Sequence, residues 1–283
     1  MSKFSTSWNL LKDSWRVLMR DKEIMLFPMA SGIACLLVLL TFAVPWLGAT
    51  ALSWRGVLRG QSDSVMFVLL FLYYLCNFFV VVFFNAALVD FVVTRLRGGE
   101  PTIRGSLRAA VACLPQIAVW SLISATVGVV LQWLSQRAGF ITRIAISLVG
   151  VAWALLTYFV IPFIVIDRRG ALDAIGDSKE LLRKTWGQQV ISGVGFGLVG
   201  FLLVLPGIAV LIASIFGVLM ANGAGWEFWG LLAVAAVLYF VALGVVLSTL
   251  KAIFGAALYL FATSGETPNG FLADDLRGAI KPA

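Results

Sequence analysis

The chain has 283 residues, of which 61% are hydrophobic and 12% are charged. Soluble domains contain roughly half apolar and roughly a quarter charged residues, so this composition excludes an ordinary water-soluble fold. The 21 Lys and Arg exceed the 14 Asp and Glu, which gives a formal net charge of +7. A basic balance is typical of proteins that contact nucleic acid or an anionic membrane surface. In so apolar a chain we expect membrane lipids as the partner and no nucleic acid.

Residues 1–23 have the pattern of an amphipathic helix. One helical stripe is apolar, and the basic side chains of this segment are turned away from it. The stripe consists of Phe4, Trp8, Leu11, Trp15 and Leu18, and the basic side chains are Lys12, Arg16 and Arg20. A helix with Trp on one face and Lys or Arg on another lies in the plane of the membrane interface. We therefore predict an interfacial helix on anionic lipid, and no signal peptide.

Six apolar stretches are long enough to cross a bilayer, which takes about 20 residues of helix. They cover residues 24–47, 66–89, 109–134, 144–166, 190–220 and 228–263. The last two exceed the bilayer thickness. Pro206 and Gly207 can kink the fifth stretch, and Lys251 marks the point where the sixth leaves the hydrocarbon.

The distribution of Lys and Arg predicts the orientation. Five precede the first span, four lie in the second loop, five in the fourth and two in the tail, so that 16 lie on one face. The first and third loops carry two each and the fifth none, so that the other face has four. Because basic residues concentrate in cytoplasmic loops, we expect both termini in the cytoplasm of a bacterial inner membrane.

Two further amphipathic segments precede the third and fifth spans. The first covers residues 104–112, and in the second Ile175, Leu182 and Trp186 share a helical face. We therefore predict an all-α polytopic integral membrane protein with six transmembrane helices and amphipathic interfacial helices before spans 1, 3 and 5. It would form a single membrane domain, residues 1–283, of three units, each an interfacial helix followed by a transmembrane hairpin. Residues 264–283 would be a cytoplasmic tail.

Acidic side chains share the opposite face of the segment before span 5. Oxygens of Asp173, Asp177 and Glu180 at this spacing could bridge a divalent cation. A solvated face with a Glu180–Lys184 ion pair explains the same residues. We favour the solvated face.

Glycines in the fifth span fit helix packing better than nucleotide binding. Residues 195–200 match the dinucleotide fingerprint G-x-G-x-x-G, but that motif works only at a strand-to-helix turn. Gly193 and Gly197 also form a G-x-x-x-G pair, which lets another helix approach closely. We predict that Gly193, Gly197 and Gly200 pack against a helix, and that the protein is a homo-oligomer or a subunit of a membrane complex.

Polar side chains inside the spans are few. Asn77, Asn85, Gln116 and Lys251 form the main candidate set, with Gln132 as a further member. Polar groups are costly in hydrocarbon, so each needs a reason. They either form hydrogen bonds between helices or line a polar path, and the sequence leaves both open.

Residues with dedicated chemistry are scarce. The chain has no histidine, which removes His-based acid–base catalysis, Ser-His hydrolysis and His metal ligation. Cys35, Cys76 and Cys113 are scattered through apolar runs, so we expect neither a disulfide nor a metal site. We predict no catalytic, cofactor-binding or metal-binding residues, no cofactor and no enzymatic activity.

Several short motifs, spread over nearly the whole chain, carry a resemblance. They are Ser14-Trp15-Arg16-Val17-Leu18, Asp21-Lys22, Leu26-Phe27-Pro28, Tyr158-Phe159-Val160-Ile161-Pro162, Leu181 to Gly187, Ala257-Leu258-Tyr259, Ala262-Thr263-Ser264-Gly265 and Pro268-Asn269-Gly270-Phe271. In these the chain resembles an uncharacterised family of bacterial six-helix membrane proteins, a domain of unknown function. The resemblance implies membership and brings no activity with it.

The function expected from these patterns is that of a membrane-organising protein or auxiliary subunit. The scarcity of acidic groups inside the spans argues against proton coupling. A channel or small-solute transporter is the alternative.

Overall fold

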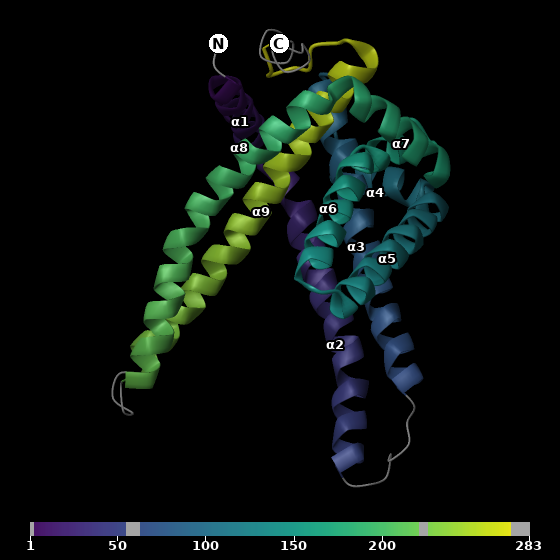
Figure 1. The fold of residues 1–283 in the computed structure, drawn as a ribbon. Helices are drawn as coiled ribbons and strands as arrows, with labels where there is room; N and C mark the ends of the chain where they lie inside the picture. Colours follow the sequence, from purple (N-terminus) through teal and green to yellow (C-terminus); the bar gives the residue numbers. More distant parts are fainter. Residues whose placement is uncertain (1–2, 55–62, 221–225, 273–283) are drawn as a thin grey trace. The chain divides into compact units, whose positions relative to one another are not determined.

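The computed structural model describes residues 3–54, 63–220 and 226–272, and within these ranges the side chains of residues 3–7, 44–54, 63–67 and 184–199 lie outside the description (Figure 1). The described residues form nine α-helices and one short 3-10 helix, and no strand. Six segments are long and apolar enough to cross a membrane: Lys22–Ala43, Val68–Leu96, Leu114–Arg137, Phe140–Val165, Gly200–Met220 and Trp226–Ser264. The all-α, six-span prediction is confirmed.

The chain divides into two compact units, one of residues 1–25 with 185–283 and one of residues 26–184. The first holds α1 (Lys3–Arg20), η1 (Lys22–Met25), most of α8 (Ala171–Met220) and α9 (Trp226–Ser264). The second holds α2 (Leu26–Trp54), α3 (Asp63–Leu96), α4 (Ile103–Ala112), α5 (Leu114–Arg137), α6 (Phe140–Leu156), α7 (Val160–Val165) and the start of α8.

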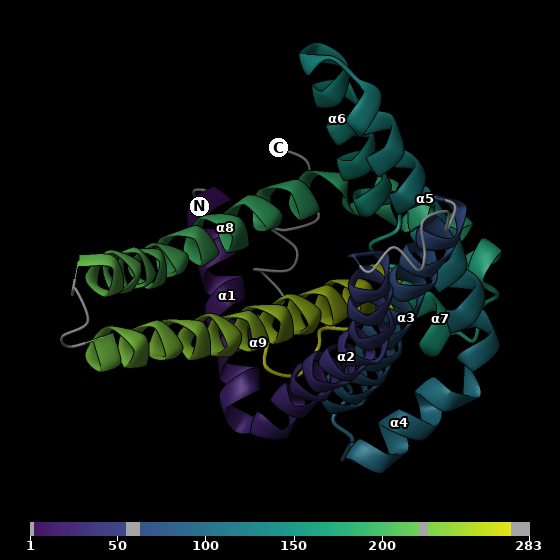
Figure 2. The same cartoon turned by 90° about the horizontal axis from the view of Figure 1, so that it is seen from below.

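In the first unit, α8 and α9 form an antiparallel hairpin in which glycines of α8 face side chains of α9 (Figures 1 and 2). A Cβ added to Gly207 would come within 2.8 Å of the Phe240 ring, and one added to Gly217 would overlap Trp229. Close helix approach through glycine is common in membranes, because van der Waals packing drives helix association there. α1 and η1 pack against α9 in the same unit.

The tail after α9 also packs within this unit. Gly270 has a φ of 91°, a left-handed conformation that glycine adopts without strain. A Cβ at this position would lie 3.1 Å from Cγ2 of Val17, so the tail approaches α1 closely. Pro268 and Phe271 are buried beside it. Part of the predicted tail therefore belongs to the folded unit.

In the second unit, α3 is the central helix and contacts α2, α4, α5 and α7. Its half towards the C-terminus is buried from Ala86 to Val89 and from Phe91 to Val93. Phe91 meets Phe27 of α2 edge to face, with ring centroids 5.6 Å apart. On the other side, Trp120 of α5 and Trp153 of α6 stack at 6.1 Å. Aromatic packing therefore joins α3 to α2, and α5 to α6.

Several predicted boundaries differ from the structure, and the second span, for example, ends at Leu96 rather than at 89. The third span begins at Leu114 rather than at 109. The helix is interrupted at Cys113, because Pro115, two residues later, has no N–H for the carbonyl of Val111 and is accommodated in the first turn of α5. The fourth begins at Phe140 rather than at 144, and residues 157–159 interrupt it between α6 and α7. The interfacial segment before span 5 is not separate, because α8 runs without a break from Ala171 to Met220.

Candidate membrane interface

The helix α1 has one face that packs on protein. Leu10, Asp13, Ser14, Val17 and Leu18 are buried on this face, and α1 contacts α9. Leu18, which the sequence pattern places on the lipid stripe, therefore faces protein. The rest of α1 is left to form a second surface.

That second surface carries large apolar side chains. Trp8, Trp15 and Met19 are 47%, 45% and 41% exposed. At 100° per residue these three positions lie within about 40° of one another, and they point away from the buried face. Two indoles are thus directed outwards from the unit to which α1 belongs.

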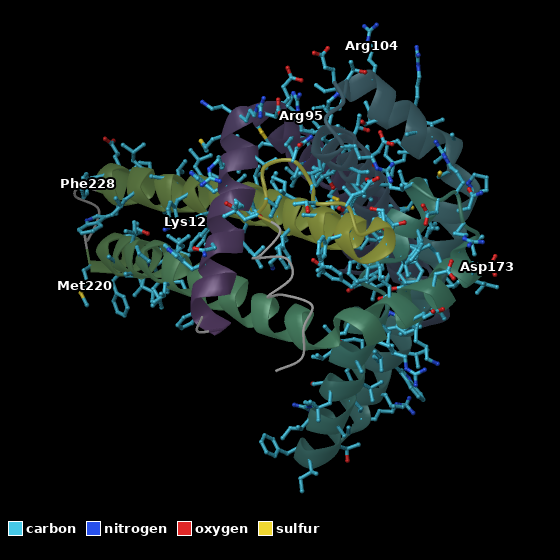
Figure 3. The ribbon with its side chains drawn as sticks, turned by 90° about the horizontal axis from the view of Figure 1, so that it is seen from above. Lys12, Arg95, Arg104, Asp173, Met220 and Phe228 are labelled. Atoms are coloured by element: carbon cyan, nitrogen blue, oxygen red, sulfur yellow. The ribbon has the colours of Figure 1, made fainter. Side chains whose placement is uncertain are left out.

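Basic side chains follow the indoles around the helix, with Lys12 about 40° from Trp8, and Arg16 and Arg20 about 80° and 120° from it. Lys12, Arg16 and Arg20 are all exposed, and the Lys12 ammonium lies 5.6 Å from the centroid of the Trp8 ring. Figure 3 shows the Lys12 side chain leaving α1. We call Trp8, Lys12, Trp15 and Met19, together with Arg20 at the edge towards the buried face, the α1 outer surface.

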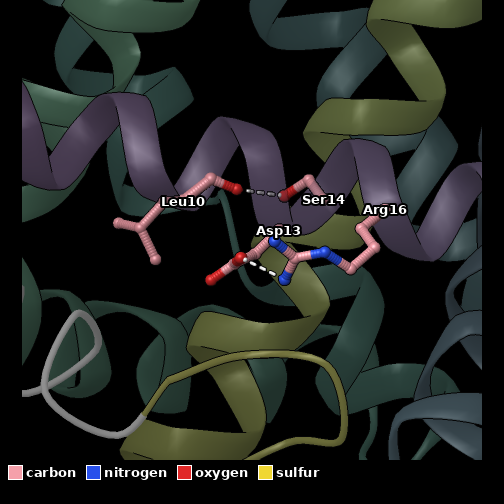
Figure 4. Close-up of polar contacts among 4 residues, drawn as sticks. All are labelled: Leu10, Asp13, Ser14 and Arg16. Atoms are coloured by element: carbon pink, nitrogen blue, oxygen red, sulfur yellow. Dashed lines mark hydrogen bonds and ion pairs between the residues drawn. The ribbon is translucent and has the colours of Figure 1, made fainter.

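Arg16 forms an ion pair with a residue of the buried face of α1. Its Nη1 donates to Oδ1 of Asp13 at 2.9 Å, and the Asp13 carboxylate is almost completely buried (Figure 4). One turn earlier the Ser14 hydroxyl donates to the carbonyl of Leu10 at 2.8 Å. Removing Arg16 would therefore disturb a buried carboxylate as well as the outer surface.

The start of α8 is amphipathic, as the sequence pattern predicts, but different residues form its buried face. That face consists of Ala171, Ala174, Ser178, Leu181 and Leu182. Ile175 is half-buried, and the side chains of Trp186 and Lys184 lie outside the described residues. Of the three residues predicted to share the apolar face, Leu182 is thus buried and Ile175 half-buried.

The acidic residues of this segment are open to solvent on one side. Asp173 and Glu180 are exposed, and Oδ2 of Asp177 lies 3.3 Å from Nε of Arg169. Figure 3 shows Asp173 at the periphery. Within the described residues no three His, Cys, Asp or Glu side chains lie close enough to hold a metal ion.

The candidate polar-path residues fall in both units. Asn77 and Asn85 are half-buried on α3, and Nδ2 of Asn77 donates to the carbonyl of Tyr73 in its own helix. Gln116 is half-buried on α5, and Gln132 is exposed. Lys251 is exposed on α9, in the other unit. The structure thus brings three of the four main candidates into one unit.

On α5, two buried polar side chains besides Gln116 were not singled out by the sequence pattern. The hydroxyls of Ser121 and Ser124 and Oε1 of Gln116 are buried, and no described residue bonds to them. Burying a polar group without a hydrogen bond costs free energy. Ser121 and Ser124 lie about 60° apart around α5, and these buried oxygens are unusual for a helix in hydrocarbon.

Of the three glycines predicted to pack against a helix, Gly200 has surroundings that the structure describes. Gly200 is buried, and a Cβ there would lie 3.3 Å from Cδ1 of Leu247 on α9. The surroundings of Gly193 and Gly197 lie outside the described residues.

Three groups that hold helices together carry little signal in the sequence. The Ser178 hydroxyl bridges the break between α6 and α7, Arg168 contacts Cys113, and Tyr239 bonds to α8. Each joins residues distant along the chain, so periodicity within one helix does not reveal it. Pro206, in the α8 helix that Tyr239 bonds to, is a local hint.

The chain matches a known protein family over most of its length. A family of unknown function, DUF6159, matches residues 64–270, which is most of the chain. The chain belongs to the DUF6159 family. The resemblance to a family of unknown function is thereby confirmed over these residues. No curated protein and no solved structure matches the chain.

The DUF6159 match starts at the beginning of α3 and ends within the tail. It includes α4 and the whole α8–α9 hairpin, whereas α1 and α2 precede it. The α1 outer surface therefore lies in the part of the chain before the family match, and α4 lies inside it.

Proposed function

We propose that this DUF6159 protein is a non-enzymatic membrane-organising protein or auxiliary subunit that gathers anionic lipids at the cytoplasmic leaflet of a bacterial inner membrane. The observation that supports it is the α1 outer surface. Trp8 and Trp15 point away from α9, with Lys12 beside Trp8 and the exposed Arg20 at the edge of the same surface.

Two additive terms would hold α1 at such a leaflet. An indole at the interface places its apolar ring among acyl chains and leaves its N–H at the headgroups, which contributes a few kcal/mol at most. Each Lys or Arg near an anionic surface adds about 1 kcal/mol. The first term is independent of salt and the second is screened by it. A surface with both types of side chain therefore selects anionic over neutral lipid.

The orientation and the partners in this proposal rest on sequence. The excess of Lys and Arg on one face supports cytoplasmic termini. Apolar side chains remain exposed along the spans, as in the second span at Val68 and Leu70, and these faces would contact lipid, a second copy or other subunits of a complex.

Lipid enrichment around the full chain tests the proposal. Membrane discs excised with a polymer would be compared for their anionic lipid content between wild type and a Lys12→Gln, Arg20→Gln variant. Arg16 is kept because of its bond to Asp13. We expect the variant discs to approach the bulk membrane composition. A matched control, Arg137→Gln with Arg143→Gln, removes two guanidiniums from the loop predicted to be external and should leave the enrichment unchanged.

Tryptophan quenching separates the two terms. Brominated phosphatidylglycerol and brominated phosphatidylcholine would be compared in nanodiscs, with Trp8→Phe and Trp15→Phe identifying the contribution of α1. If wild-type discs show no anionic enrichment and the two brominated lipids quench alike, the proposal fails.

Transport of a small solute is a second candidate, favoured by the three buried oxygens on α5. If they line a water-filled path, thiols introduced by Ser121→Cys and Ser124→Cys should react with a membrane-impermeant thiol reagent. Thr126→Cys, at an exposed position of the same helix, is the control for modification from lipid. Unreactive thiols at 121 and 124 would remove the support for this candidate.

A further inference from the structure

The helix α4 presents a basic stripe to the outside of the second unit. Arg104 and Arg108 are exposed one turn apart, and Val111, in the next turn, is 51% exposed. These positions fall within about 60° of one another around the helix. Figure 3 shows Arg104 extending outwards from α4. On the opposite face, Ser106 and Ala110 are buried, and α4 contacts α3.

Both ends of α4 are fixed. At its start, the Thr102 hydroxyl accepts a hydrogen bond from the backbone N–H of Gly105 at 3.1 Å, a standard helix N-cap. At its end, Nη1 of Arg168 donates to the carbonyl of Ala109 at 3.1 Å and contacts Sγ of Cys113 at 2.8 Å. The Cys113 thiol in turn lies 3.4 Å from the carbonyl of Ile164 on α7.

The Arg168 contact involves an unusual backbone conformation. The φ of Arg168 is 56°, in the left-handed region that non-glycine residues rarely adopt. Such a conformation persists when its surroundings hold it. The segment after α7 therefore holds the end of α4. Through these contacts Arg168, in addition to the helix break at Cys113, fixes the direction of α4 relative to α5.

The position of α4 along the chain sets its depth. It follows the candidate span that ends at Leu96 and precedes the one that starts at Leu114. A short helix that joins two spans on one side of a membrane lies near the headgroups. Along α4 the exposed stripe begins with the guanidiniums of Arg104 and Arg108 and ends with the apolar side chain of Val111, next to the start of the third span. This order matches the change from lipid headgroups to acyl chains.

We propose that Arg104, Arg108 and Val111 form a second anionic-lipid contact, in which the guanidiniums bind phosphate groups of the cytoplasmic leaflet and Val111 contacts acyl chains. Guanidinium groups match phosphate geometry well, because they donate two parallel hydrogen bonds. This inference rests on the proposed function for the type of partner. Its residues and its place in the fold are separate from α1.

Affinity for soluble short-chain phosphatidylglycerol, measured on the full chain in neutral nanodiscs, tests the α4 contact. We expect Arg104→Gln with Arg108→Gln to weaken binding by about fivefold for each guanidinium removed. Short-chain phosphatidylcholine should bind equally to variant and wild type. The Arg137→Gln, Arg143→Gln variant is again the matched control. Unchanged phosphatidylglycerol affinity in the α4 variant would overturn the inference.

The same measurement on the α1 variant keeps the two proposals distinguishable. If Lys12→Gln with Arg20→Gln weakens binding and the α4 variant does not, the α4 inference fails and the proposed function stands. If only the α4 variant weakens binding, the role of α1 fails and the α4 contact stands.

Photo-crosslinking identifies what covers the stripe in cells. A benzoylphenylalanine substituted for Val111 should form adducts with phospholipid, and Arg104→Gln with Arg108→Gln should reduce the anionic share of those adducts. Adducts with a second copy of the chain or with another protein, without lipid adducts, would overturn the inference.

Discussion

The buried hydroxyl of Ser178 stabilises the break between two helices. Ser178 is fully buried, its Oγ donates to the carbonyl of Leu156 at 2.6 Å, and it accepts the backbone N–H of Phe159 at 3.2 Å. These two backbone groups flank the break between α6 and α7. One side chain thus satisfies both groups that the interrupted helix leaves without their usual partners.

Ser178→Ala should therefore destabilise the protein. It removes the hydrogen bonds that this hydroxyl makes to the N–H of Phe159 and the carbonyl of Leu156, for which we expect a loss of about 1–3 kcal/mol. Ser147→Ala is the control, because the Ser147 hydroxyl is exposed and donates to the carbonyl of Arg143 in its own helix. Thermal unfolding in detergent measures both variants. Equal Tm values for the two would contradict the assigned role of Ser178.

Among the elements, the α8–α9 hairpin shows how a proline is accommodated in a long apolar helix. Pro206 has no N–H for the carbonyl of Leu202, and a proline ring crowds that carbonyl in an α-helix. The carbonyl of Leu203 lies in the same turn and accepts a hydrogen bond from the Tyr239 hydroxyl of α9 at 2.5 Å. A neighbouring helix therefore supplies a donor at the site of the proline.

Tyr239→Phe should weaken the hairpin by about 0.6–1.7 kcal/mol, the range for hydrogen bonds between membrane helices. With Pro206→Ala the backbone can restore its own bonds, so the two effects should couple in a double-mutant cycle. Tyr74→Phe is the control, since Tyr74 is exposed on α3. Unfolding in detergent gives the free energies. Additive effects would mean that the hydroxyl and the proline act independently.

At the scale of the whole molecule, the orientation in the membrane follows from charge. A reporter fused after Ala283 should be active in the cytoplasm, and one inserted within residues 221–225 should be active in the periplasm, because the predicted topology puts both termini on the face with 16 of the Lys and Arg. Assays of both fusions in a bacterial host measure this. The reverse activity at either site would rule out the six-span topology.

For the interfacial helices, the sequence pattern predicts an amphipathic character but not the elements against which they pack. The sequence pattern groups α1 with the hairpin that directly follows it. In the structure α1 instead packs against α9 and the tail, more than 200 residues away. The amphipathic character was predictable, whereas the partner of each face was not.

By itself the amino-acid sequence determined the class of the protein, its six spans and the presence of amphipathic segments. These properties depend on hydrophobicity and periodicity over about 20 residues, and both are local. Only the tertiary structure decided which face of α1 is left outside, that Arg168 reaches Cys113, and that Ser178 bridges the break in the fourth span. These contacts join residues far apart in the chain, and several of them use backbone carbonyls, which every residue has and no sequence pattern distinguishes.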